Sequence, residues 1–130
     1  MNKYKYIILM SILIITVTIA IIFINLKSNV FEGKIIQTEN KFSLEYSFFN
    51  KTIFHTMSIK EGMSVSVKIE NTSGNIDVII VDSNDNEIYR GNKIDKENSF
   101  YINIKETGNY TFKVKGNRAK GSVKFDIIEF

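Results

Sequence analysis

The sequence predicts an all-β protein: a single antiparallel β-sandwich, jelly-roll-like and of about eight strands, preceded by one N-terminal transmembrane helix. Three observations predict this fold. An uncharged apolar run fills residues 7–24. From residue 41 onward, apolar and polar residues alternate with a period of two in successive short segments. Turn-forming residues separate these segments, and no helical periodicity follows the apolar run.

The apolar run has the length of a membrane span. With its flanking residues, 6–26, it comprises 21 residues, or about 31 Å of helix, against about 30 Å for the hydrocarbon core of a bilayer. Its many Ile, Leu, Val and Phe side chains favour insertion by roughly 4–8 kcal/mol. Lys3 and Lys5 precede the run and Lys27 follows it. We therefore expect the N-terminus inside and the remainder of the chain outside the cytoplasm, at the cell membrane.

A cleaved signal peptide is the alternative for this segment, because Thr18-Ile19-Ala20 weakly resembles a small-x-small cleavage site. The apolar run continues past that site, and no Cys is present for lipid attachment, so an uncleaved signal anchor is favoured. The predicted organisation is a cytoplasmic N-terminus at 1–5, a transmembrane anchor at 6–26, a stalk at 27–40 and a β-domain at 41–130. One further strand is expected within the stalk, at 34–37.

The β-domain shows the clearest alternation at residues 63–70, where one face is apolar and the other polar. Residues 76–82 are apolar on both sides and indicate a central strand. An OB-like barrel is the structural alternative, but no glycine is placed to bend its first strand. The remaining alternating segments are 42–48, 53–59, 87–90, 100–104, 110–114 and 123–127. Turns are expected between segments, including 72–74 and 116–117.

Composition narrows the class of protein. The chain has no Cys, so neither a disulfide nor a thiolate metal site is expected. The net charge of +3 comes from the lysines around the apolar run, because 14 basic residues face 14 acidic ones from residue 28 onward. The basic pI therefore gives no reason to expect a nucleic-acid partner. Abundant Ile, Lys and Asn, with no Pro or Trp, are typical of an AT-rich bacterial genome.

Residues 57–128 resemble the pre-peptidase C-terminal and GOLD-like β-sandwiches of bacterial exported proteins. The likeness lies in EGMSVSVKIENTSGNIDVIIVDSNDNEIYRG and ETGNYTFKVKGNRAKGSVKFDI. These segments combine a glycine turn before an alternating strand, a strand ending in Asp, and a Gly-x-Tyr turn into the closing hairpin. The resemblance implies a non-catalytic accessory module and transfers no catalytic residue.

Candidate catalytic and metal-binding residues are few. His55 is the sole histidine, and its position on the apolar side of a strand favours a half-buried ring bonded to backbone. Residues 82–87 place oxygen ligands at alternate positions, as a calcium loop does, but Glu87 stands where such a loop has Gly. A plain hairpin turn is therefore favoured. No Gly-x-Ser-x-Gly elbow accompanies the serines, so no enzyme, cofactor or metal is predicted, and a small hydrolase is the least favoured class.

Basic residues concentrate near the C-terminus, where six of them between 105 and 124 face Glu106 alone. Solubilising lysines are one explanation, and a surface for anionic lipid or wall polymer is the other. The candidate surface-binding residues are Lys113, Lys115, Arg118, Lys120 and Lys124. Phe49, Phe54, Tyr101 and Ile128 fall on the nominally polar side of their strands. They are candidates for an exposed binding patch, and fully buried strands or strands paired under a loop explain them equally well.

Together these features favour a membrane-anchored extracytoplasmic binding or accessory module that acts through protein–protein interaction. The alternative is a cell-surface protein that binds carbohydrate or an anionic wall polymer through the basic residues above.

Overall fold

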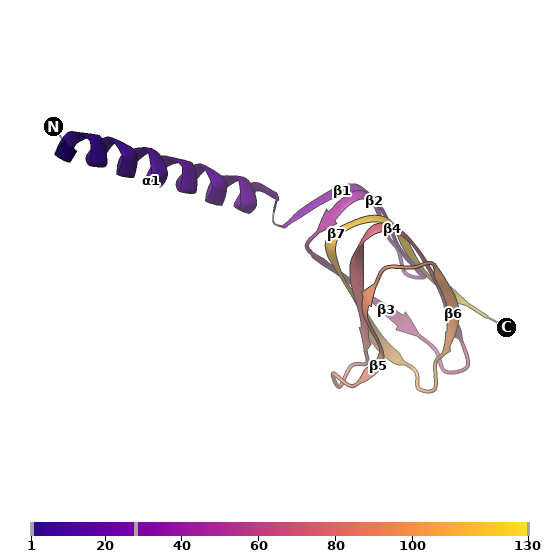
Figure 1. Cartoon of the computed structure of the whole chain (residues 1–130). Coiled ribbons are helices and arrows are strands. Elements are labelled where there is room, and N and C mark those ends of the chain that lie inside the picture. Colours follow the sequence, from indigo (N-terminus) through magenta and orange to yellow (C-terminus); the bar gives the residue numbers. More distant parts are fainter. Residues whose placement is uncertain (1, 28, 130) are drawn as a thin grey trace.

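A computed structural model describes residues 2–27 and 29–129, with the side chains of residues 24–27 outside the description. In this part of the chain, one helix precedes seven strands (Figure 1). The elements are α1 (Asn2–Lys27), β1 (Val30–Gln37), β2 (Lys41–Asn50), β3 (Thr52–Ile59), β4 (Ser64–Val81), β5 (Glu87–Ile94), β6 (Asn98–Asn103) and β7 (Gly108–Ile128). The predicted order, an apolar helix followed by an antiparallel β-sandwich, is confirmed.

Helix α1 extends away from the strands (Figure 1), and all its described side chains are exposed. An 18-residue window of the helix has a mean hydropathy of 2.8, and by length and composition the helix can cross a membrane. Three hydroxyl side chains in its apolar stretch are satisfied locally, because Ser11, Thr16 and Thr18 each donate to a carbonyl oxygen one turn earlier, at 2.8 Å. Hydroxyl groups bonded within their own helix are suited to an apolar solvent.

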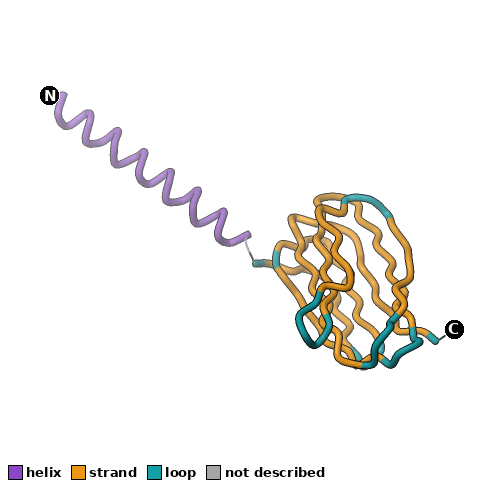
Figure 2. The backbone as a smooth tube through the Cα atoms, turned by 90° about the horizontal axis from the view of Figure 1, so that it is seen from below, coloured by secondary structure: helices purple, strands orange, loops and turns teal. Residues whose placement is uncertain are grey.

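The strands form two layers that share two long strands (Figure 2). The first sheet has the order β1-β2-β7-β4-β6, and the second has the order β3-β7-β4-β5. Strand β7 contributes residues 108–117 to the second sheet and residues 119–128 to the first. Strand β4 contributes residues 64–71 to the first sheet and residues 75–81 to the second. The sandwich is therefore one antiparallel sheet folded over at a bend in β4 and β7.

The bend changes which residues of each long strand face the interior. Register shifts at Asn71–Ser73 and Ser73–Asn75 interrupt the alternation of β4. Because side chains alternate with a period of two, an odd insertion moves the apolar set from one parity to the other. The buried residues of β4 are Val65, Val67 and Ile69 before the bend and Ile76, Val78 and Ile80 after it. Those of β7 change likewise, from Tyr110, Phe112 and Val114 to Ala119, Val123 and Phe125.

Two expected turns are bends inside continuous strands. The sequence placed chain reversals at residues 72–74 and 116–117, but β4 and β7 continue through them. Gly74 has φ +65°, and Arg118, just after the second expected turn, has φ +49°. Residues that favour positive φ mark a departure from extended geometry, and this departure need not reverse the chain. The described chain therefore has seven strands, whereas about eight were expected.

Strand pairing begins earlier than the sequence suggested. The stretch 27–40, expected as a stalk, includes β1, which pairs with β2 from Val30 to Gln37. Phe31 anchors this strand to the core, because its ring packs 5.2 Å from Phe49 and 6.1 Å from Tyr46, centroid to centroid. Residues 28 and 29 alone separate α1 from β1 in sequence.

The core lies between the two sheets and is rich in aromatic rings. Phe42 stacks on Phe125 with centroids 5.7 Å apart, and Phe112 lies 5.0 Å from Phe125. Of the four residues expected on the polar side, Phe54 and Tyr101 are 63% and 62% exposed and Ile128 is half-buried. Phe49 is buried, as the alternative explanation had it, because a register shift between Tyr46 and Phe49 reverses the alternation.

Candidate functional site

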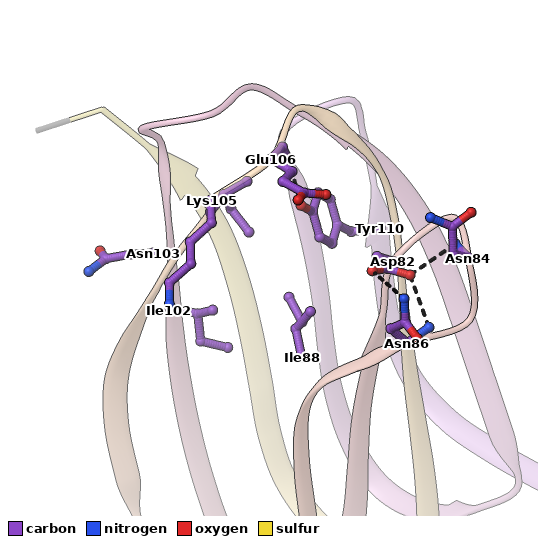
Figure 3. Close-up of a pocket in the computed structure, with 10 residues that line it drawn as sticks. Asp82, Asn84, Asn86, Ile88, Ile102, Asn103, Lys105, Glu106 and Tyr110 are labelled. Carbon is purple, nitrogen blue, oxygen red and sulfur yellow. Dashed lines mark hydrogen bonds between the residues drawn. The ribbon is translucent and has the colours of Figure 1, made fainter.

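A cavity of about 590 Å³ (Figure 3) is lined by turns at the end of the sandwich that lies away from α1 in Figure 1. It lies between the β4–β5 turn and the β6–β7 turn, on the side where the edge strands β5 and β6 meet. Both strands pair with β4 alone, so their outer edges are unpaired within the described chain. We call this cavity the distal pocket.

The floor of the distal pocket is apolar. Ile104 and Tyr110 are buried in the core cluster, whereas Ile102 is half-buried and Ile88 is 38% exposed. These side chains come from β5, β6 and β7 and from the β6–β7 turn, so the pocket continues the core outward. An aliphatic or aromatic group that enters the pocket would contact these side chains and leave water.

One wall of the pocket is the β4–β5 turn, which is built around Asp82. Its Oδ1 accepts hydrogen bonds from the backbone N–H groups of Asn84 and Asn86, both at 2.9 Å, and its Oδ2 accepts one from Asn86 Nδ2 at 3.3 Å. The backbone N–H of Asn86 contributes most to lowering the pKa of Asp82. The N–H donors hold the carboxylate against its own turn (Figure 3). The predicted hairpin turn is confirmed, and a cation at Asp82 would have to displace these donors.

The opposite wall carries Asn103, Lys105 and Glu106. Tyr110 ties this wall to the floor, because its hydroxyl donates to the carbonyl oxygen of Glu106 at 2.5 Å. Burial raises the pKa of Tyr110, and the charge of Glu106 raises it further. The Asn103 side chain points away from the pocket (Figure 3) and accepts a hydrogen bond from Ser64 at 2.8 Å. The rim thus offers a cation, two carboxylates and amide groups around an apolar floor.

The apolar floor and polar rim of the distal pocket are suited to binding a ligand. No histidine lies near the pocket, and the carboxylate of Asp82 is engaged by its own turn. Across residues 2–27 and 29–129, no group of three His, Asp or Glu side chains is arranged to hold a metal ion. An apolar floor with convergent polar groups at the rim is the usual form of a binding pocket.

His55 lies elsewhere, on β3. Its Nε2 is 2.7 Å from the carbonyl oxygen of Thr38, and its ring is 5.4 Å from that of Phe42. The predicted half-buried histidine bonded to backbone is confirmed. The bond ties the edge strand β3 to the β1–β2 turn, a structural task.

The five candidate surface-binding residues all lie on β7, but the bend separates them. Lys113 and Lys115 lie on the outer face of the second sheet, Lys113 beside the exposed Phe54. Lys124 lies on the outer face of the first sheet, where its Nζ is 3.2 Å from Glu45 Oε1. Arg118 and Lys120 lie at the bend itself. The structure thus distributes these cations over three surfaces.

Sequence reasoning missed the distal pocket. Residues 82–87 had been noted as a turn, yet no local pattern links them to Ile102 or Tyr110. Those side chains meet because β5 and β6 flank the same strand, β4, in different sheets. The signal available was only the apolar–polar alternation that also predicts an ordinary core.

No protein-family model matches the chain, and no curated protein sequence matches it. Among solved structures, the chain is similar to PliG of Aeromonas hydrophila, a periplasmic inhibitor of g-type lysozyme. The identity is 19%, the TM-score is 0.49, and the alignment covers 73% of this chain and 92% of that one. It is also similar to accessory secretory proteins 1, 2 and 3 of Streptococcus pneumoniae, with 11% identity, a TM-score of 0.40, and 79% and 89% coverage.

The resemblance expected from the sequence is also found. The chain is similar to the pre-peptidase C-terminal domain of a Bacillus anthracis collagenase, with 15% identity, a TM-score of 0.48, and 76% and 91% coverage. At these identities and TM-scores no activity, ligand or partner passes from these proteins to this chain. What the chain shares with them is a β-sandwich outline, here behind an apolar helix.

Proposed function

We propose that this protein is a membrane-anchored, non-catalytic accessory module that binds a protein partner outside the cytoplasm through the distal pocket. Helix α1 is the uncleaved anchor, with Lys3 and Lys5 on the cytoplasmic side and the sandwich outside. The observation that carries the proposal is the position of the pocket. The β4–β5 and β6–β7 turns that line it lie at the end of the sandwich opposite α1 (Figure 1), so an anchored domain presents the pocket away from the bilayer.

The chemistry of the pocket favours a polypeptide ligand. Ile88 and Ile102 offer contact to one aliphatic or aromatic side chain, and Lys105 and Glu106 offer pairing to charges of either sign. The unpaired edges of β5 and β6 offer backbone N–H and C=O groups to an extended segment. A protein partner supplies all three kinds of group at once.

Wall polymer, the alternative ligand, requires several cations on one surface. Lys113 and Lys115 lie on one outer face and Lys124 on the other, where Glu45 pairs with it. A flat polyanion that lies on the face of Lys113 and Lys115 therefore cannot contact Lys124. This division favours the protein partner.

Site-specific photo-cross-linking tests the proposal in the full-length protein within its own membranes. A photoreactive phenylalanine analogue replaces Ile88 at the pocket or Lys68 on the outer face of the first sheet as the matched control. We expect one dominant protein adduct from position 88 and none of that mass from position 68. Mass spectrometry of the adduct then identifies the partner.

Two further results would count against the proposal. Equal adducts from both positions, or wall fragments alone, would contradict pocket recognition of a protein. An Ile88→Asp variant should lose the partner in co-purification while remaining in the membrane fraction, because a charge in the pocket disfavours an apolar ligand. Retention of the partner by this variant counts equally against the proposal.

A further inference from the structure

The end of the sandwich that carries the bend lies beside the end of α1 (Figure 1). Val30 begins β1 and is opposite Asn50 of β2, whose Oδ1 accepts a hydrogen bond from the Arg118 backbone N–H at 3.3 Å. Three Cα–Cα steps separate Lys27 from Val30, a span of at most about 11 Å. A headgroup layer is about 5–7 Å thick. An anchor formed by α1 therefore holds this end at the headgroup surface.

Three cations gather at this end, and we name Lys51, Arg118 and Lys120 the basic corner. Lys51 is the single residue between β2 and β3, and its carbonyl oxygen accepts a hydrogen bond from Gly116 N–H at 2.9 Å. The Lys120 carbonyl oxygen accepts one from the Thr72 hydroxyl at 3.0 Å. These bonds hold the backbone of the corner in place. Within the described chain none of the three side chains forms an ion pair.

Arg118 has an unusual backbone conformation for an arginine. Its φ of +49° lies in the left-handed region, which Gly or Asn adopts at lower cost. The side chain is exposed, so core packing does not explain it. Costly conformations of this kind gather at functional sites.

Two acidic residues, Asp95 and Glu97, lie in the β5–β6 turn, and β6 is two strand positions from β7, which carries Arg118 and Lys120, in the first sheet. At about 4.8 Å per strand this separation is about 10 Å, slightly more than the Debye length of about 8 Å at physiological salt. Glu32 and Glu70 are closer and reduce the local charge, leaving the corner cations in excess on the side that adjoins α1.

We propose that the basic corner docks on anionic phospholipid headgroups of the membrane that α1 enters, fixing the tilt of the sandwich so that the distal pocket points outward. The inference rests on the membrane anchor in the proposed function. Cations held within a Debye length of an anionic surface are attracted to it, and each strengthens docking by on the order of fivefold. Docking replaces a freely pivoting domain with an oriented one.

The absence of Cys allows one label per molecule in the full-length protein. Asn117→Cys places a fluorophore at the bend, and Asn84→Cys places the matched control at the β4–β5 turn. Each protein is reconstituted in nanodiscs of phosphatidylcholine alone or of equal parts phosphatidylcholine and phosphatidylglycerol. Both lipid mixtures carry a headgroup-linked nitroxide quencher. We expect stronger quenching at position 117 in the anionic discs, lost at about 1 M salt, where the Debye length is about 3 Å. Position 84 should remain unquenched in both.

A charge variant separates electrostatic docking from simple tethering. K51Q/R118Q/K120Q should lower the docked-to-free ratio by on the order of fivefold for each cation removed. The control K60Q/K68Q/K113Q removes three exposed cations elsewhere and should keep the wild-type quenching. Equal quenching at 117 in both lipids, or an unchanged K51Q/R118Q/K120Q variant, would overturn the inference. Co-elution with the discs reports the anchor separately, so loss of docking with co-elution intact leaves the anchor in the proposed function standing.

Discussion

At the scale of single residues, the buried hydroxyl of Tyr46 lowers the stability of the fold. Its ring packs against Phe31 and Phe49, but its buried hydroxyl has no hydrogen-bond partner among the described residues. The same burial raises the pKa of Tyr46 far above its usual value. Tyr110 is the useful comparison, because the residue is also buried, at 5% exposure, yet its hydroxyl donates to the carbonyl oxygen of Glu106.

Tyr46→Phe should leave the free energy of unfolding unchanged or raise it by about 1 kcal/mol, because it removes an unsatisfied polar group and keeps the ring. Tyr110→Phe should lower it by about 0.5–1.5 kcal/mol through the lost hydrogen bond. Urea unfolding followed by tyrosine fluorescence or circular dichroism measures both. Equal losses in the two variants would contradict the assignment of the unpaired hydroxyl.

Asp82 provides a prediction for pH dependence. Hydrogen bonds from Asn86 and Asn84 lower its pKa in the folded state, below the value of about 3.9 in an unfolded chain. Between those two values the unfolded state binds more protons, so stability falls as pH falls. The contribution of Asp82 is complete above about pH 4 and is lost as the pH drops through the folded-state pKa.

Asp82→Asn should remove that part of the pH dependence. Urea unfolding of the wild type and of the variant between about pH 2.5 and pH 7 measures the effect. The wild type should be the more stable at about pH 7, and its advantage in unfolding free energy over the variant should narrow as the pH falls through this range. A difference that stays constant with pH would mean that the turn does not depend on the ionised carboxylate.

At the scale of elements, the bend depends on close approach between β4 and β7. A Cβ atom on Gly121 would lie 1.9 Å from the Glu70 carbonyl oxygen, and its φ is +147°. Gly62 provides a contrast, because its φ is +88° but no atom lies within 4 Å of its Cβ position. Comparison of the two glycines therefore distinguishes the free-energy cost of steric crowding from the cost of an unfavourable backbone conformation alone.

Gly121→Ala should lower the unfolding free energy by clearly more than about 1 kcal/mol, because backbone must shift as well as adopt an unfavourable φ. Gly62→Ala should cost about 1 kcal/mol. Chemical denaturation of the two variants in parallel gives the comparison. If Gly121→Ala cost no more than Gly62→Ala, the strands at the bend would be more loosely packed than the structure shows.

At the scale of the whole molecule, the sandwich does not draw on α1 for its core. Every buried core side chain lies between Phe42 and Phe125, and all described side chains of α1 are exposed. The sandwich therefore buries its own apolar side chains, whereas the helix presents its apolar side chains on its surface.

A chain of residues 29–130 should fold without the helix. We expect a cooperative urea transition with an unfolding free energy on the order of 5–10 kcal/mol, together with near-ultraviolet circular dichroism from ordered tyrosines. Compact but non-cooperative unfolding would show that the anchor takes part in folding. The same domain should be absent from membrane pellets that retain the full-length protein.

The sequence by itself determined the apolar N-terminal helix, the all-β class and most of the buried set. These properties are local: an uncharged run of span length, and alternation with a period of two, are visible without knowing which strands pair. The Asp82 turn was predictable for the same reason, since its hydrogen bonds lie within the turn. The half-buried position of His55 followed from the alternation along its own strand, whereas its partner Thr38 lies in another turn.

Only the tertiary structure decided where β4 and β7 bend, which strands meet at the distal pocket and which cations share a surface. Gly74 and Arg118 adopt positive φ, a feature of turns and bulges alike, and pairing across both sheets determines which one forms. The bend then separates Lys113 from Lys124 and brings Arg118 close to Lys51 and the start of β1. Contacts between residues distant in sequence arise from pairing and closure of the sheet, and alternation along one strand carries no information about them.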